Sequence, residues 1–204
     1  MSLTIWGSLF VVCLLGAMSP GASLAMVARH SLGGGRLHGV VTAWSHALGV
    51  GFYALLTVSG LAVLLHHTPW LFHTISYLGA AYLIWLGIGA LRSKGGIAEH
   101  LESGRHCSLG RAARDGLMIS LINPKLILFF LALFSQFVAA GAASHDHAIV
   151  IGTPLLVDGL WYTLIAMLLS HPRVLEVLRA KAVWIDRLCG LVLILVALRV
   201  VWPV

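Results

Sequence analysis

The side chains best suited to chemistry are polar or charged residues inside long apolar stretches. Asn123, Pro124 and Lys125 form a polar triplet in one such stretch. Asp158 lies in a second apolar stretch, and His46 lies in a third. An ionised side chain at the centre of a bilayer costs about 2.5–3.5 kcal/mol on insertion scales, so such residues face the protein interior or a water-filled path. The chemistry they suit is the binding of a charged solute and the transfer of a proton.

Proline interrupts two of the apolar stretches. Pro124 has no N–H group and cannot complete a helical hydrogen-bond ladder, and Pro20, followed by Gly21, has the same effect in the first stretch. The carbonyl groups of Ser120 and Gly16 therefore need other donors, and such breaks are tolerated in membranes where they face protein or a water-filled cavity. The simpler alternative is a proline kink without a function.

Composition places these stretches in a membrane. The 204 residues are 59% hydrophobic and only 10% charged, against about 25% charged in soluble domains, and the mean hydropathy is +0.96. The stretches are long enough for helices, so the predicted fold class is all-α and integral to the membrane. The net charge of +6 is expected to set orientation in the membrane, and we expect no nucleic-acid partner. Three cysteines are too few for a disulfide framework.

The apolar stretches predict six transmembrane helices in a single membrane domain, 1–204. A polar segment, 93–115, separates a first three-helix half, 1–92, from a second, 116–204. The expected spans are Leu3–Val27, Leu37–Leu65, Ile75–Leu91, Leu117–Ala140, Ala148–Ser170 and Leu188 to the end of the chain.

The distribution of Lys and Arg predicts the orientation. Eleven of the thirteen lie between spans one and two, three and four, or five and six, and the positive-inside rule assigns these connections to the cytoplasm. Both termini are then periplasmic, and 93–115 is a cytoplasmic loop of a bacterial inner-membrane protein. Three spans that begin outside, followed by three that begin inside, match a 3+3 inverted repeat with a proline-broken first helix in each half.

Three ionisable groups have similar predicted depths in the bilayer. At roughly 1.5 Å per residue, Lys125 and His46 lie about 13 Å from the cytoplasmic surface and Asp158 about 15 Å. We expect Lys125 and Asp158 to pair, directly or through water, with Lys125 binding a substrate carboxylate and Asp158 carrying the proton. A structural Lys–Asp pair is the alternative. A hydrogen-bonded packing residue is the alternative for His46.

The chain resembles the LysE/RhtB amino-acid exporters over nearly its whole length. The resemblance rests on Ser19-Pro20-Gly21, Asn123-Pro124-Lys125 and Asp158, together with Ala81-Tyr-Leu-Ile-Trp-Leu-Gly87 and Ala132-Leu-Phe-Ser-Gln-Phe137. It implies a six-helix inner-membrane exporter of amino acids or related metabolites, driven by the proton gradient. It also marks Pro20, Gly21, Asn123, Pro124, Lys125 and Asp158 as functional. Ala22 and Ser135 stand where the family usually has proline.

A second hypothesis remains open. His66, His67, His73, His145 and His147 lie in the two predicted periplasmic loops, so a non-transporting assembly or metal-sensing protein is the alternative to an exporter. We find no nucleophile motif or phosphate loop and therefore expect neither an enzyme nor a cofactor. The expected partners are an amino-acid-like solute and the lipid bilayer, and a homodimer is compatible with so small a bundle.

Overall fold

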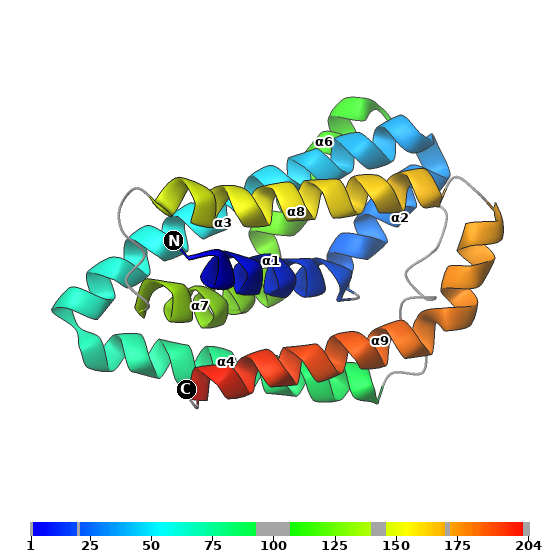
Figure 1. The fold of residues 1–204 in the computed structure, drawn as a ribbon. Coiled ribbons are helices and arrows are strands. Elements are labelled where there is room, and N and C mark those ends of the chain that lie inside the picture. The colour runs from blue at the N-terminus through cyan, green and yellow to red at the C-terminus, as the bar shows by residue number, and fades with distance from the viewer. Residues whose placement is uncertain (1, 20, 93–106, 140–145, 170–171, 202–204) are drawn as a thin grey trace.

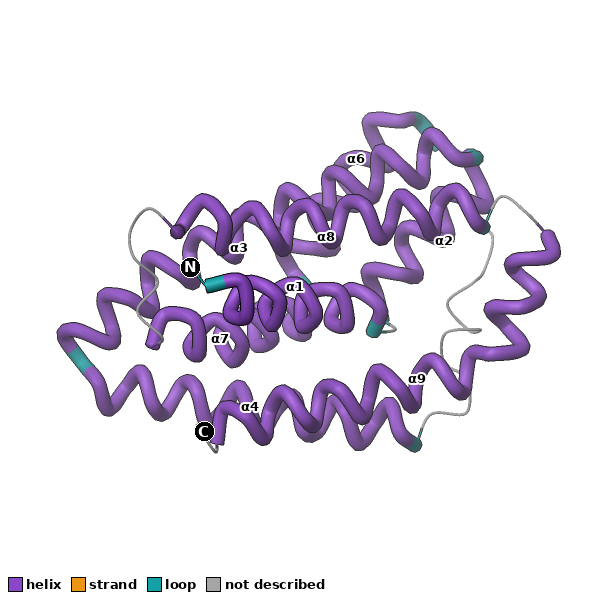
Figure 2. Tube along the Cα trace, viewed as in Figure 1, coloured by secondary structure: helices purple, strands orange, loops and turns teal. Residues whose placement is uncertain are grey.

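The computed structural model describes residues 2–19, 21–92, 107–139, 146–169 and 172–201, and these ranges contain helices and no strand. Figures 1 and 2 show an elongated bundle in which the longest helices lie roughly along one direction and shorter ones cross them obliquely. The helices are α1 (Leu3–Met18), α2 (Ala22–Gly34), α3 (Arg36–His67), α4 (Pro69–Leu91), α6 (Leu109–Ile122), α7 (Pro124–Ala139), α8 (His147–Leu168) and α9 (Pro172–Val201).

Two pairs of long helices frame the bundle. Helix α3 packs along α8, and α4 packs along α9, while α1 lies against α8 (Figure 1). One apolar core joins these helices, with Leu9, Val50, Leu83 and Phe130 among its members. Large apolar side chains such as Leu160 remain exposed, which suits a surface that faces lipid.

The first proline-containing stretch forms two helices rather than one. Helix α1 ends at Met18, α2 begins at Ala22, and their axes differ by 62°. Ser19 between them has extended backbone, with φ −63° and ψ 124°. Pro20 itself lies outside the described residues, so its predicted role stays a prediction.

The second proline stretch breaks in the same way. Helix α6 ends at Ile122, Asn123 has extended backbone with φ −75° and ψ 108°, and Pro124 is the first residue of α7. Proline suits a first helical position because its fixed φ fits and no hydrogen bond is lost there. The Asn123 side chain caps the new helix, because its Oδ1 accepts from the Lys125 backbone N–H at 3.0 Å. The second break is therefore present at the predicted Pro124, and the first lies between Met18 and Ala22.

Three described helices are long and apolar enough to cross a bilayer: α4, α8 and the segment Arg36–Gly60 of α3. The bent pair α1 and α2 makes a fourth candidate if it is counted as one span.

Several helices extend beyond the spans predicted for them, because the positions of charged residues mark the ends of apolar segments and not the ends of helices. Arg29 lies within α2, and only Gly35 separates α2 from α3. Helix α6 begins at Leu109, inside the predicted loop 93–115, with Ser108 as its N-cap. Helix α9 begins at Pro172, about four turns before the predicted Leu188. These helices continue beyond their apolar portions into polar sequence.

Candidate functional site

A small cavity lies between the two helix breaks. Its volume is about 30 Å³, room for about one or two water molecules. The predicted residues Lys125, His46, Asp158 and Asn123 all line it, so three helices bring the ionisable groups to one place, as their depths predicted. The full lining is Cys13, Gly16, Ala17, Ser23, His46, Val50, Asn123, Lys125, Leu126, Phe129, Phe130, Pro154, Asp158 and Tyr162.

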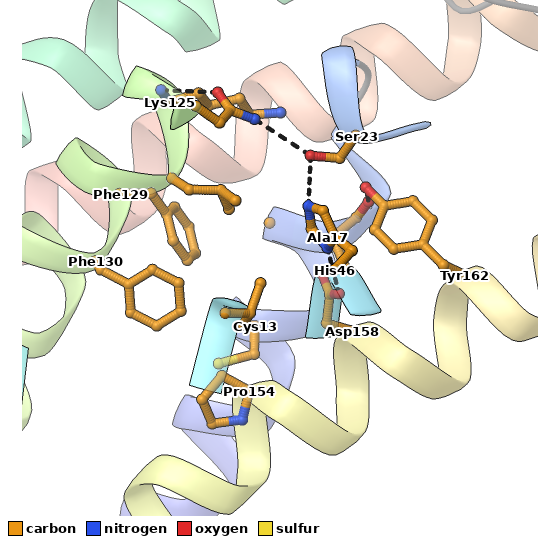
Figure 3. A pocket seen from close by; sticks show the side chains of 14 residues that line it. Cys13, Ala17, Ser23, His46, Lys125, Phe129, Phe130, Pro154, Asp158 and Tyr162 are labelled. Carbon is orange, nitrogen blue, oxygen red and sulfur yellow. Dashed lines mark hydrogen bonds and ion pairs between the residues drawn. The ribbon is translucent and has the colours of Figure 1, made fainter. Parts of the chain in front are cut away.

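A continuous chain of hydrogen bonds crosses the polar side of this cavity (Figure 3). His46 Nδ1 lies 2.7 Å from Asp158 Oδ2, and His46 Nε2 lies 2.8 Å from Ser23 Oγ. Asn123 Nδ2 in turn donates to Ser23 Oγ at 3.2 Å. The chain thus joins α8, α3, α2 and the break between α6 and α7. All four side chains are buried.

The partners determine where the hydrogens lie when Asp158 is ionised. A carboxylate only accepts, so His46 Nδ1 carries a hydrogen and donates it to Asp158. In a neutral imidazole the other nitrogen then accepts, so Ser23 donates its hydroxyl hydrogen to His46 Nε2. Ser23 Oγ meanwhile accepts from Asn123. Every group along the chain is satisfied in this arrangement.

Lys125, which lies at the break between α6 and α7, donates hydrogen bonds to the break between α1 and α2. Its Nζ donates to the backbone oxygen of Ser19 at 2.9 Å and to Ser19 Oγ at 2.7 Å. Gly21 lies beside it, since a Cβ at that position would be 3.5 Å from Lys125 Nζ. The ammonium group therefore meets a carbonyl that the end of α1 leaves outside the helical ladder.

The predicted pairing of Lys125 with Asp158, directly or through water, stays a prediction. Asp158 pairs with His46, and Lys125 donates two hydrogen bonds to Ser19. Both side chains line the same cavity from different sides. His46, for which a packing role was the alternative, supplies the partner of the Asp158 carboxylate.

Two tyrosines satisfy carbonyl groups at the helix breaks. Tyr162 of α8 donates to the oxygen of Ala17 at 3.1 Å, and Tyr53 of α3 donates to the oxygen of Leu121. Each acceptor is the next-to-last residue of its broken helix, one residue beyond the carbonyls predicted from proline alone. The difference arises because each helix ends at the break, which frees its whole last turn.

The remaining cavity wall is apolar. Phe129 and Phe130 lie across from His46 and Asp158, and Cys13 also lines the cavity (Figure 3). The Phe129 ring packs onto Gly16, where an added Cβ would lie 2.5 Å from the ring. The site thus has one polar and one apolar wall.

Sequence reasoning did not single out Ser23, Tyr162 or the two phenylalanines. A signal was available for Ser23, because it is a polar residue two positions after the Pro-Gly break. The alternative hypothesis of a histidine metal site finds no support in the described residues, which contain no group of three or more His, Cys, Asp or Glu able to hold a metal. The side chains of His66 and His145 lie outside the described part of the chain.

Apolar helices with polar and ionisable side chains buried between them indicate a multi-pass membrane protein. The sequence model of the family described as LysE type translocator matches residues 14–202, and the chain belongs to this family, as the sequence motifs predicted.

Named relatives match most of the chain. It is 26% identical to the threonine efflux protein of Salmonella typhi over 92% of this chain and 93% of the relative. It is 30% identical to the homoserine/homoserine lactone efflux protein of Salmonella typhimurium over 75% of this chain and 74% of the relative. It is 34% identical to the leucine efflux protein of Salmonella choleraesuis over 65% of this chain and 60% of the relative. No solved structure matches.

Proposed function

We propose that this protein is a secondary transporter that exports amino acids across the bacterial inner membrane by proton antiport. The observation that carries the proposal is the cavity between two broken helices, which places the Lys125 ammonium group and the His46–Asp158 pair against an apolar wall. The names of the relatives, which are efflux proteins for threonine, homoserine and leucine, support amino acids as the solutes.

The polar wall suits the two charges of an amino acid. Lys125 offers a positive group to the substrate carboxylate, and it can exchange its bonds to Ser19 for bonds to the substrate. Asp158 and the carbonyl groups at the breaks can accept from the substrate ammonium group. The phenylalanines would then contact the substrate side chain.

Proton coupling is assigned to the His46–Asp158 pair. When a proton reaches the pair and His46 becomes an imidazolium ion, Nε2 also donates, so Ser23 must accept from it instead of donating to it. Ser23 Oγ already accepts from Asn123, and its own hydrogen turns toward another acceptor. Protonation therefore changes the hydrogen bonds that join α2 to the break at Asn123.

The 3+3 inverted repeat is part of the proposal. The reciprocal tyrosine contacts support it, because each proposed half supplies the donor that satisfies the broken helix of the other half. Six spans, with periplasmic termini and the segment before α6 in the cytoplasm, would follow from such a repeat and from the distribution of Lys and Arg.

The cavity is too small to hold the proposed substrate. A volume of about 30 Å³ is less than any amino acid occupies, so substrate entry requires the lining helices to separate. The two breaks are suitable hinges, because their backbone has no continuous helical ladder to bend.

Transport in everted membrane vesicles tests the proposal. Vesicles that contain the protein should accumulate radiolabelled threonine, homoserine or leucine when an inward-acidic gradient is imposed, and collapse of the gradient should release it. Asp158→Asn should abolish gradient-driven accumulation, whereas Glu176→Gln, at an exposed position of α9, should leave it unchanged. Undiminished accumulation with Asp158→Asn would exclude the proposed proton role.

A further inference from the structure

A second polar cluster lies outside the cavity, where α2, α3 and the start of α6 meet. The thiol Sγ of Cys107 lies 3.3 Å from His30 Nδ1, and His30 Nε2 lies 3.1 Å from Asp115 Oδ2. His38 of α3 donates through Nε2 to the backbone oxygen of Cys107 at 2.8 Å. The proposed transport mechanism uses none of these residues.

The contacts orient a base toward the thiol. The Asp115 carboxylate accepts from His30 Nε2–H, so His30 Nδ1 is the nitrogen that accepts from the Cys107 S–H. A thiol hydrogen-bonded to an imidazole, which a carboxylate orients in turn, is the arrangement that activates a sulfur nucleophile. His30 is buried and holds its position, and the bond from His38 fixes the backbone of Cys107.

The other two cysteines provide an internal comparison. Cys13 and Cys189 are 6% and 2% exposed, whereas Cys107 is partly exposed. Only Cys107 among the three lies beside an imidazole in the described contacts. The positive-inside rule predicts that its end of the bundle is cytoplasmic, where thiols are kept reduced.

We propose that Cys107 is a reactive thiol that His30 activates toward small disulfides, so that this chain carries a site of reversible mixed-disulfide formation. In the reaction His30 Nδ1 takes the proton from the thiol, and Sγ attacks one sulfur of the disulfide. The S–S bond of that disulfide breaks as the new S–S bond forms. The departing thiolate takes the proton from the imidazolium ion, and a second thiol reverses the exchange.

The adduct would alter the contact between α2 and α6, because its sulfur no longer donates to His30. Both helices lead to the cavity: His30 lies two turns from Ser23 along α2, and Asp115 lies on the helix that ends before Asn123. The site is nevertheless independent of transport, since its reactivity rests on the local contacts alone.

The reaction of purified full-length protein with dithiodipyridine, a small disulfide that releases a coloured product, tests the proposal. We expect one thiol per chain to react, with Cys107 identified by peptide mass. The rate of an ordinary thiol falls about tenfold for each pH unit below about 8.5, whereas the rate at Cys107 should fall less than about threefold between pH 8 and pH 6. In the part of the chain that the structure describes, Arg29 and His38 are charged or titratable groups near His30, and Arg111 and Arg114 lie near Asp115.

Two substitutions test whether Cys107 reacts because His30 activates its thiol or only because the thiol is exposed. His30→Gln should lower the rate at pH 6 by about tenfold or more and leave the rate at pH 9 nearly unchanged, because the thiolate then forms without a base. Asp115→Asn keeps an acceptor for His30 and should lower the pH 6 rate by a smaller factor. His67→Gln, at an exposed position, is the control. Absence of reaction in the folded protein, an ordinary pH dependence, or an unchanged pH 6 rate in folded His30→Gln would each overturn the proposal.

Discussion

His46 and Asp158 form an enclosed pair between α3 and α8, with Nδ1 and Oδ2 2.7 Å apart and side chains 1% and 8% exposed. This pair joins two helices that pack against each other along much of their length. Since each partner is removed from water, each depends on the other for its charge or hydrogen bond.

Loss of one partner should therefore lower the free energy of unfolding more than loss of both partners. His46→Leu leaves the Asp158 carboxylate unpaired in the interior, and we expect it to lower the free energy of unfolding by about 3–5 kcal/mol. The double variant His46→Leu/Asp158→Leu should be more stable than His46→Leu alone. Thermal unfolding in detergent measures the stability of the single and the double variant. A double variant whose loss equals or exceeds the sum of the two single losses would contradict a coupled pair.

Lys125 should matter for transport more than for stability. In Lys125→Gln the amide can still donate to Ser19, so the helix break retains a donor. The positive charge proposed for the substrate carboxylate is lost. We expect the transport rate in vesicles to fall at least about tenfold, which corresponds to about 1.4 kcal/mol, while the unfolding temperature changes little.

Lys181→Gln is the matched control for this change, because Lys181 is exposed on α9. It removes the same charge from a position outside the cavity. Equal transport by the two variants at limiting substrate concentration would show that Lys125 does not bind the substrate.

The helix breaks could be predicted from the sequence, whereas the polar chain between them could not. A proline has no N–H group to donate to the helical ladder, and beside the polar residues Asn123 and Lys125 this predicts the break at Pro124. Proline alone does not fix a break, because Pro154 lies inside α8 without ending it. The contacts of His46 with Ser23 and Asp158 depend instead on how α2, α3 and α8 are rotated about their own axes. In a membrane the lipid-facing and protein-facing surfaces are both apolar, so hydrophobic periodicity does not reveal that rotation.

The helix ends were harder to predict than the spans for a related reason. Apolar sequence marks the portion of a helix inside the bilayer, and hydrogen bonds of the backbone continue the helix beyond it. The charge of Arg187 predicts a loop, yet Arg187 lies well inside α9. Likewise, the predicted loop 93–115 includes Asp115, which belongs to α6 and contacts His30.

The two tyrosines that reach across the breaks should contribute similar amounts of stability. Tyr162→Phe and Tyr53→Phe keep the ring and remove only the hydroxyl group that donates to Ala17 or Leu121. Each leaves a carbonyl oxygen at a helix end without that donor, and the expected loss is about 1–3 kcal/mol. Thermal unfolding in detergent measures it.

Tyr77→Phe serves as the control for both tyrosine variants, because Tyr77 is 54% exposed on α4. It should unfold at nearly the same temperature as the parent protein. If the three phenylalanine variants are equally stable, the hydroxyl groups of Tyr53 and Tyr162 do not support the breaks.

The α4–α9 pair should be sensitive to a single methyl group at Gly87. A Cβ there would lie 2.6 Å from Ile194 Cγ1 and 2.7 Å from the backbone oxygen of Gly190, so Gly87→Ala forces the two helices apart. Overpacking of this kind costs about 1–3 kcal/mol. Gly89→Ala, on the same helix, meets nothing within 4 Å and should be neutral or stabilising, because alanine favours a helix by up to about 1 kcal/mol over glycine. Equal unfolding temperatures for the two variants would show that α4 and α9 do not depend on this close approach.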